Sequence, residues 1–350
     1  MDSLTTITEL SHEFGGADYV KGGGGNTSCK NAETLWIKPS GTTLSGLQPE
    51  TFVAMNRHKI NALYAVKTPA DKASREDLVK NVMADAVMSG SSGRPSVEAP
   101  LHNVFNATFV VHTHPALVNG MTCAKNGKTV CAKLFPEALW IGYIDPGYTL
   151  CMHVRTEIET YRAAHNREPS VLFLENHGVF VAADTAGEIR GLYANVIGTL
   201  KAAYANAGVP TELLVGKPTA CGIENVKRLL DGESVSIAFS GRFAVADGPV
   251  TPDHIVYSKS YPFTGTLTEE HIAAFKKKHG YSPRVIVADG AVFGAGASQK
   301  SADLALVLAQ DGALVQQLAE AFGGLQFMTT GAREFIENWE VESYRSNQMK

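Results

Sequence analysis

Two histidines spaced two residues apart, at the end of an apolar β-branched run, constrain this chain more than any other feature. His112 and His114 lie in the segment VHTHP, directly after the run TFVV at residues 108–111. A run of this kind predicts a strand, and residues i and i+2 of a strand point to the same face. The spacing therefore predicts that both imidazoles converge on one point at a strand end.

A third histidine stands at a comparable place. His177 follows the apolar run at residues 170–174 and precedes Gly178 and a second apolar run at residues 179–183. Three neutral imidazoles around a divalent ion leave one or two coordination positions open, which is the arrangement of catalytic zinc sites. The alternative is that all three are ordinary strand histidines bonded to the backbone, and the neighbouring motifs decide between the two interpretations.

Composition excludes several classes of function. The 350-residue chain has a formal net charge of −4 with both signs interspersed, so nothing favours nucleic acid or an anionic membrane as a partner. Its five cysteines show no C-x-x-C spacing, which argues against a disulfide framework and a thiolate zinc site. The N-terminus lacks a signal-peptide pattern, and no apolar run is long enough to span a bilayer. We therefore expect a soluble, cytoplasmic protein.

Helical and strand patterns mix along the chain without a regular βαβ repeat. Helices are predicted over residues 4–14, 74–88, 97–105, 157–165, 221–230, 268–279 and 298–322, and between Asp184 or Thr185 and Gly208. Strands are predicted over residues 35–38, 108–111, 170–183, 254–257 and 284–288. These patterns indicate an α/β fold with αβα layers around a largely antiparallel sheet.

The pattern changes after Pro210. We predict a metal-dependent catalytic domain over residues 1–210 and a smaller α/β module of unknown role over residues 211–350. The glycines after the last predicted strand of this module (Gly290, Gly294 and Gly296) do not have G-x-G-x-x-G spacing, so no dinucleotide site is predicted.

Three loops rich in small residues precede or surround the first histidine motif. They are the glycine run and NTS segment at residues 22–28, the PSGT turn at 39–42 and the SGRPS segment at 92–96. Their amides and hydroxyls could hold an anion, mainly through neutral donors. Three unrelated turns are the alternative, but their number favours a phosphate-bearing substrate. Glu98, among apolar neighbours, is a candidate acid/base, although a capping role is equally compatible with its position.

Five motifs together resemble the class II aldolase/adducin family. In chain order they are GNTS at 25–28, PSG at 39–41, SVE at 96–98, HTHP at 112–115 and NHG at 176–178. The match covers roughly residues 1–210. Segments at 251–254, 284–287 and 336–342 also resemble the aldolase portion of bifunctional rhamnulose-phosphate aldolase/dehydrogenase fusions. The dehydrogenase domain of those fusions is not expected in this chain.

The resemblance implies a role for each motif. It makes His112, His114 and His177 the ligands of zinc or another divalent metal and Glu98 the acid/base. It also implies that the phosphate of the substrate is held by Gly25, Asn26, Ser40, Gly41 and Ser96. One departure is Val97, which stands where simpler phosphate aldolases often carry a second serine.

The function implied is reversible cleavage of a ketose phosphate, similar to rhamnulose 1-phosphate, into dihydroxyacetone phosphate and an aldehyde. Alternatives on the same metal site are a sugar-phosphate 4-epimerase or a sugar-acid phosphate decarboxylase. A further alternative is an adducin-like binding module without catalysis. Since related enzymes are homotetramers, the resemblance also implies a homo-oligomer, with a small-molecule sugar phosphate as its ligand.

Overall fold

The computed structural model describes residues 2–69, 71–217, 222–230 and 235–339. The chain divides into two compact units, one formed by Met1–Pro115 and Cys131–Gly198, the other by Ala116–Val130 and Thr199–Lys350. Cys221, where a helix was predicted to start, and residues 340–342 of the C-terminal motif lie outside the described residues. No helix among the described residues combines the length and the apolar character needed to cross a membrane.

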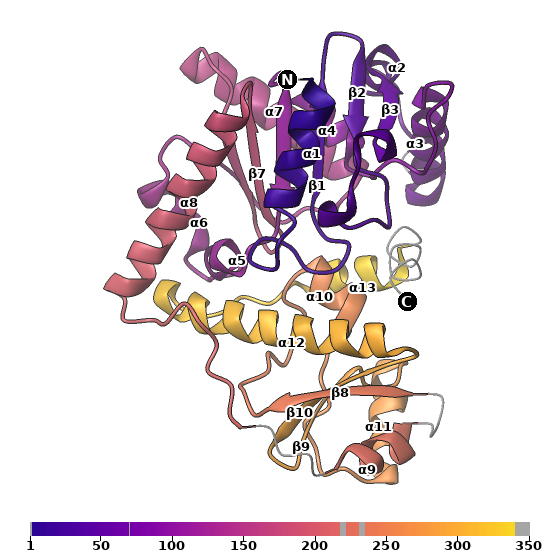
Figure 1. The fold of residues 1–350 in the computed structure, drawn as a ribbon, viewed down its shortest axis with the longest axis vertical. Helices are drawn as coiled ribbons and strands as arrows, with labels where there is room; N and C mark the ends of the chain where they lie inside the picture. The colour runs from indigo at the N-terminus through magenta and orange to yellow at the C-terminus, as the bar shows by residue number, and fades with distance from the viewer. Residues whose placement is uncertain (1, 70, 218–221, 231–234, 340–350) are drawn as a thin grey trace. The chain divides into compact units, whose positions relative to one another are not determined.

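The first unit is built on a seven-stranded sheet (Figure 1). Its strands are β1 (Asn26–Lys30), β2 (Thr34–Ile37), β3 (Val53–Asn56), β4 (Phe109–Thr113), β5 (Leu139–Ile141), β6 (Val171–Leu174) and β7 (Gly178–Ala183). Their order is β3-β2-β1-β4-β7-β6-β5. Every pairing is antiparallel except that of β5 with β6. The predicted α/β class with a mostly antiparallel sheet is confirmed.

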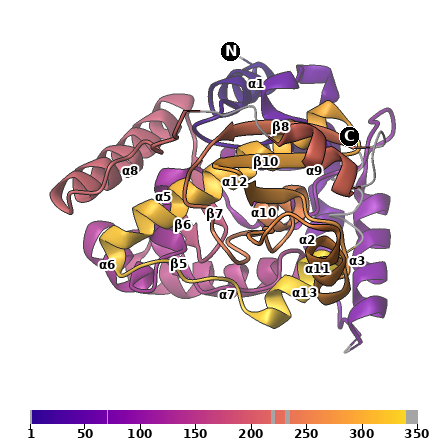
Figure 2. The same cartoon turned by 90° about the horizontal axis from the view of Figure 1, so that it is seen from below.

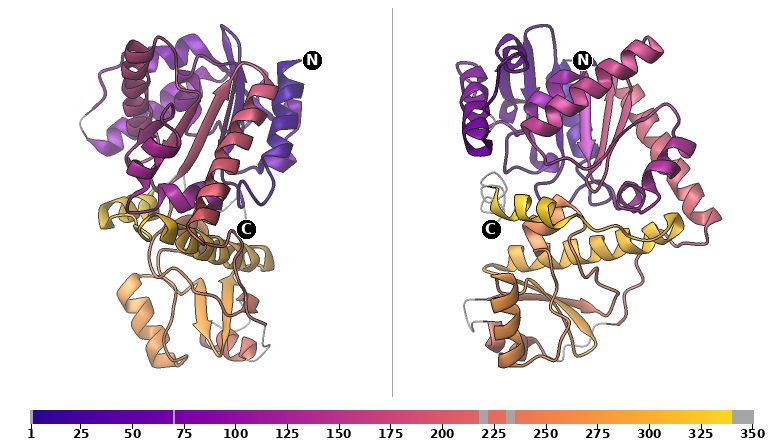
Figure 3. Two further views of the ribbon diagram at one scale, coloured as in Figure 1. Left: turned by 90° about the vertical axis from the view of Figure 1, so that its left-hand side faces the viewer. Right: turned by 180° about the vertical axis from the view of Figure 1, so that it is seen from behind.

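Helices cover both faces of this sheet. They are α1 (Ser3–Glu13), α2 (Arg57–Leu63), α3 (Lys72–Ala86), α4 (Ala99–Val104), α7 (Tyr148–His165) and α8 (Ala186–Asn206), with short 3-10 turns at Leu44–Gly46 and Pro49–Thr51. α8 begins in the first unit and runs past its end at Gly198. Figure 3 shows α1 and α8 on one side of the sheet and α7 on the other.

Successive side chains of β4 point to opposite faces of the sheet and contact different helices. Val110 packs with α4 and α7 in one apolar cluster, whereas Thr113 Oγ1 lies 2.8 Å from the hydroxyl of Tyr193 on α8. Because strand residues alternate between faces, His112 shares the face of Val110. Its ring stacks on Phe180 of β7, with centroids 3.9 Å apart. The sheet therefore buries the first histidine completely and fixes its plane.

The second unit contains a three-stranded antiparallel sheet (Figure 2). Its strands, β8 (Ser236–Gly241), β9 (Val285–Ala288) and β10 (Ala291–Gly296), lie in the order β8-β10-β9. Its helices are α5 (Ala116–Thr122), α9 (Ile223–Leu230), α10 (Pro252–Ser258), α11 (Glu269–His279), α12 (Gln299–Ala319) and α13 (Thr330–Asn338), with a 3-10 turn at Glu320–Phe322. α6 (Gly127–Leu134) crosses the boundary between the units. Val292 of β10 packs on the α12 side and Phe293 on the side of α9 and α11.

The strand predicted over residues 254–257 is wrong, because these residues belong to α10. Thr251 is an extended N-cap residue, and Pro252 and Asp253 occupy the first turn. Proline presets the helical φ where no amide hydrogen is needed, and an acidic residue there complements the helix dipole. These start signals outweigh the β preference of Ile255 and Val256.

Two glycine-containing segments also differ from expectation. The loop predicted up to Ser28 ends three residues earlier, at Gly25, since Asn26 already pairs with His112 in the sheet. Gly294 and Gly296 lie within β10 rather than in a loop. A Cβ on Gly294 would come within 2.3 Å of the carbonyl oxygen of Ala302, so this glycine permits α12 to pack closely on the sheet.

Candidate metal centre

The sheet brings the two histidine motifs together. β4 and β7 pair with His112 opposite Phe180 and Thr113 opposite Val179, which places the end of β4 beside the turn that carries His177. Asn176 in that turn adopts a left-handed φ of 52°, a conformation that asparagine tolerates better than most residues. The three histidines therefore come from a strand end and an adjacent tight turn.

Gly178 makes this close approach possible. A Cβ at this position would lie 2.4 Å from the carbonyl oxygen of Thr113 and 2.7 Å from Cδ2 of His114. Both distances are shorter than any real contact, so a larger residue would displace the His114 ring. The NHG motif thus combines His177 with the glycine that makes room for the His114 ring.

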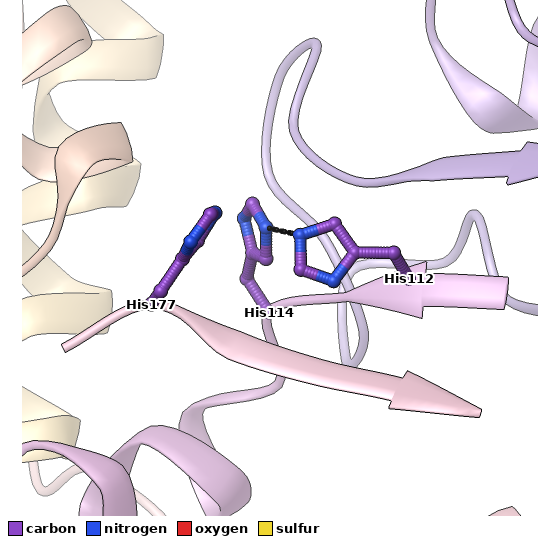
Figure 4. A group of neighbouring side chains, drawn as sticks. All are labelled: His112, His114 and His177. Carbon is purple, nitrogen blue, oxygen red and sulfur yellow. Dashed lines mark hydrogen bonds between the residues drawn. The ribbon is translucent and has the colours of Figure 1, made fainter. Parts of the chain in front are cut away.

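The three imidazoles converge, as Figure 4 shows. One nitrogen of each of His112, His114 and His177 lies within 4.8 Å of the others. Nε2 of His112 and Nε2 of His114 are 2.9 Å apart. Nδ1 of His112 lies 3.0 Å from the carbonyl oxygen of Val179, which only accepts, so Nδ1 is the protonated nitrogen. That hydrogen bond fixes the tautomer in which Nε2 offers its lone pair to the cluster. Hydrogen bonds to the other ring nitrogen play the same part in histidines that bind metals.

Glu98 completes the cluster. It is the N-cap residue of α4 and is 8% exposed. Its Oε2 lies 3.7 Å from His112 Nε2, and its Oε1 lies 4.0 Å from His177 Nε2. Oε1 is buried and has no hydrogen-bond donor among the described residues. A buried carboxylate oxygen without a donor is costly. Since the Glu98 carboxylate lies beside Nε2 of His112 and Nε2 of His177, two members of the three-histidine cluster, this donor set fits a divalent cation.

A chain of hydrogen bonds holds the other oxygen of Glu98. The side-chain amide of Asn26 donates to Oε2 at 2.5 Å, and Asn26 Oδ1 accepts from Nε2 of His102. Nδ1 of His102 then accepts from the Ser28 hydroxyl at 2.8 Å. Burial holds the pKa of His102 well below its usual range, so its ring is neutral and its two nitrogens keep opposite roles. The chain fixes the orientation of the Asn26 amide toward the carboxylate.

The predicted phosphate-binding residues are only partly gathered by side-chain contacts. Ser96 Oγ accepts from Asn26 Nδ2 at 3.3 Å and from the Glu98 amide at 3.2 Å. Ser40 is connected to this segment through its backbone, because its amide donates a hydrogen bond to the carbonyl oxygen of Arg94 at 2.8 Å. Gly41 follows Ser40 with a left-handed φ of 82°. The turn of residues 39–42 therefore lies beside residues 94–96, where its amides and hydroxyls can serve one ligand.

Gly25 meets a requirement of the backbone. Its φ is 67°, and a Cβ there would lie 2.7 Å from the His112 carbonyl oxygen. A side chain at Gly25 would therefore push β1 away from β4, the strand that leads into the HTHP motif.

Sequence reasoning missed Lys38. This lysine is only 3% exposed, and its ammonium donates to the carbonyl oxygen of Gly23 at 3.3 Å. It thus places a cation beside the glycine-rich loop, where mainly neutral donors were expected. Its position immediately before the PSG turn was the available signal. A lysine at the end of an apolar strand looks like a solvated boundary residue, so the pattern alone did not distinguish it.

Comparison with known proteins finds a family whose model matches more than half of this chain. The family model of the class II aldolase and adducin N-terminal domain matches residues 5–203. An uncharacterized oxidoreductase, YuxG of Bacillus subtilis (strain 168), is 22% identical over 391 residues, with 92% of this chain and 55% of that protein covered. The chain spans about half the length of this curated relative.

Solved structures show a similar fold. The N-terminal class II aldolase domain of a conserved Thermoplasma acidophilum protein matches with a TM-score of 0.50 and 23% identity, covering 57% of this chain and 93% of that one. YgbL of Klebsiella pneumoniae, a putative aldolase/epimerase/decarboxylase, matches with a TM-score of 0.41 and 16% identity. This match covers 59% of this chain and 91% of YgbL. At this identity the Thermoplasma likeness speaks for the fold alone.

Proposed function

Because the chain belongs to the class II aldolase and adducin family, we propose that it is a metal-dependent lyase that reversibly cleaves a ketose phosphate between C3 and C4. The products would be dihydroxyacetone phosphate and an aldehyde. The observation that carries this proposal is the cluster of three imidazoles beside Glu98. The Oε1 atom of Glu98 is buried and has no hydrogen-bond donor among the described residues. A binding module has no need of a buried carboxylate at this place.

His112, His114 and His177 would hold the ion, and the all-imidazole set favours zinc. When bound, such an ion supplies Lewis-acid polarisation of the substrate's oxygens. The orienting bond from Nδ1 of His112 to the Val179 carbonyl would hold that ring in its ligand geometry.

Glu98 would move the proton at C3. In cleavage, its protonated form gives a proton to C3 as the C3–C4 bond breaks; in synthesis, its carboxylate takes the same proton away. The Asn26 amide, 2.5 Å from Oε2, keeps the carboxyl group from rotating and leaves Oε1 directed at the cluster. The proton of the C4 hydroxyl requires a second acceptor.

The phosphate would bind where the glycine-rich loop meets the turns at residues 39–42 and 94–96. Lys38 would contribute its charge, and the Ser40 hydroxyl and the amide of Gly41 would donate hydrogen bonds. Charged hydrogen bonds of this kind contribute about 1.5–3 kcal/mol each. A rhamnulose 1-phosphate-like ketose is the proposed substrate, and a cytoplasmic homotetramer is the proposed assembly.

Metal content is the first test. We expect about one zinc per chain by elemental mass spectrometry, and loss of the metal in His112→Ala and His177→Ala. His153→Ala is the matched control, since His153 lies partly exposed on α7 beside Glu157. Full metal occupancy in the double variant lacking His112 and His177 would overturn the assignment.

Product analysis with a panel of ketose phosphates and sugar-acid phosphates distinguishes the reactions that this metal site could support. Dihydroxyacetone phosphate and an aldehyde identify the aldolase. An inverted stereocentre without cleavage identifies a 4-epimerase, and release of carbon dioxide from a sugar-acid phosphate identifies a decarboxylase. A metal-loaded protein that turns over none of these substrates would favour the adducin-like binding module.

A further inference from the structure

The first unit contains a cavity at the C-terminal end of α4, whereas Glu98 lies at the N-terminal end of this helix. Its volume is about 530 Å³, and three arginines and three asparagines dominate its lining: Arg57, Arg155, Arg162, Asn61, Asn103 and Asn106. We call this cavity the arginine pocket. Neither the histidine cluster nor the glycine-rich loops contribute to it. Its size is that of a site for a small metabolite.

The helical repeat explains why these side chains face one cavity. On α7, Arg155 and Arg162 are seven residues apart, with the buried Ile158 between them, so all three share one face of the helix. On α2, Arg57 and Asn61 are four residues apart and also share a face. The last turn of α4 supplies Asn103. The pocket is therefore built on three helices rather than on a mobile loop.

The charges in the arginine pocket are not balanced. Arg155 pairs with Glu159 at 2.9 Å and Arg162 pairs with Glu168, as expected for partly exposed side chains. Arg57 instead bonds to neutral acceptors, with Nε 2.7 Å from Asn103 Oδ1 and Nη1 2.5 Å from the Asn31 carbonyl oxygen. No carboxylate in the described part of the chain forms an ion pair with it.

Arg57 is also partly withdrawn from water. Burial lowers its pKa, yet a guanidinium stays protonated throughout the physiological range. Two of its five N–H groups are used by the neutral acceptors. A half-buried positive charge with donors to spare is best satisfied by an anion, and the planar guanidinium fork matches phosphate oxygens bidentately.

We propose that the arginine pocket binds the phosphate group of a small phosphate ester, at a site separate from the metal centre. Arg57 and Arg155 bind the phosphate, and the side-chain amide nitrogen of Asn61, which lines the same pocket, donates to a hydroxyl group of the same ligand. Asn103, which accepts from Arg57, also donates to Asn61 Oδ1 at 2.8 Å and to the Tyr64 hydroxyl at 3.0 Å. This network holds Arg57 in position before a ligand arrives.

Arginine-directed labelling with phenylglyoxal, read residue by residue by peptide mass spectrometry, tests the proposal. The probes are glucose 6-phosphate and inorganic phosphate, each compared with sodium chloride at the same ionic strength. We expect glucose 6-phosphate to slow the labelling of Arg57 and Arg155 at least fivefold. Arg190, a partly exposed arginine paired with Glu13 on the other side of the sheet, is the internal control and should be unaffected.

Calorimetric titration with glucose 6-phosphate separates this site from the catalytic one. Arg155→Gln, at a partly exposed position where folding is not at risk, should weaken the binding at least tenfold. Ser40→Ala, which removes a hydroxyl assigned to the catalytic phosphate site, should leave the binding in the arginine pocket unchanged, so the result does not depend on the proposed lyase activity.

If neither probe slowed the labelling of Arg57 and Arg155 relative to sodium chloride, the proposal would be overturned. Protection by inorganic phosphate but not by the ester would overturn the assigned ligand class.

Discussion

Replacing Asn26 by alanine separates two roles that its position allows. The resemblance to the aldolase family implies that Asn26 binds the phosphate of the substrate. The structure instead shows its amide donating to Glu98 Oε2 at 2.5 Å and to Ser96 Oγ at 3.3 Å, with its oxygen accepting from His102. If these contacts persist during turnover, Asn26 acts chiefly by orienting the carboxyl group.

The expected loss follows from the bond that is removed. A hydrogen bond to a charged group contributes about 1.5–3 kcal/mol, and each 1.36 kcal/mol of barrier is a factor of about ten in rate. Asn26→Ala should therefore lower kcat by roughly ten- to a hundredfold. KM should change little, since orientation of the acid/base matters in the transition state rather than in substrate binding.

The assay compares one ketose with and without its phosphate. A positioning role predicts the same fold-loss on both forms, whereas a phosphate-binding role predicts a loss confined to the phosphorylated form. Metal content should stay at the wild-type level. Asn31→Ala is the matched control, because the side chain of Asn31 accepts from the backbone amides of Glu33 and Thr34 and makes no contact with Glu98. A raised KM for the phosphorylated form, with kcat unchanged, would refute the positioning argument.

Three further predictions concern Glu98, Gly25 and Lys30. Glu98→Gln should keep its metal and fold but lose roughly 10²–10⁴ in kcat, as expected for a lost general acid/base; turnover near wild type would assign the proton to another group. Gly25→Ala should lower the free energy of unfolding by about 1–3 kcal/mol in urea titrations, because alanine there is strained at φ 67° and meets β4. Gly16→Ala, where nothing lies within 4 Å of the new Cβ, is its control and should change stability far less. Burial lowers the pKa of Lys30 to about 7 in the folded protein. Between pH 7 and about 10 the unfolded chain therefore binds more protons than the folded chain, and the free energy of unfolding rises with pH. Lys30→Met should flatten that rise between pH 7 and pH 9.5, and an unchanged slope would contradict it.

The core of the candidate metal centre could be predicted from local sequence because strand geometry is local. The alternation of a strand places His112 and His114 within reach of one another whatever the rest of the chain does, and a glycine beside His177 indicates a tight turn. Helices with clear capping signals were predicted for the same reason. Ser298, for example, caps α12 through its hydroxyl and the Ser301 amide.

Contacts between distant segments could not be predicted in this way. Residues 26–30 are polar and follow a glycine run, so their pattern resembles a loop. They form a fully buried strand because β2 and β4 lie on either side and take up their backbone hydrogen bonds. That pairing also places Asn26 opposite His112, and so beside Glu98, 72 residues further along the chain.

The sequence by itself determined which residue types could bind a metal and on which local elements they lie. Only the tertiary structure decided which partners they meet. It assigned the Asn26 amide to Glu98, buried Lys38 beside the glycine-rich loop, and left Oε1 of Glu98 near His177 Nε2 with no hydrogen-bond donor among the described residues. The physical reason is that periodicity and capping depend on neighbours along the chain, whereas burial and hydrogen-bond satisfaction depend on neighbours in space.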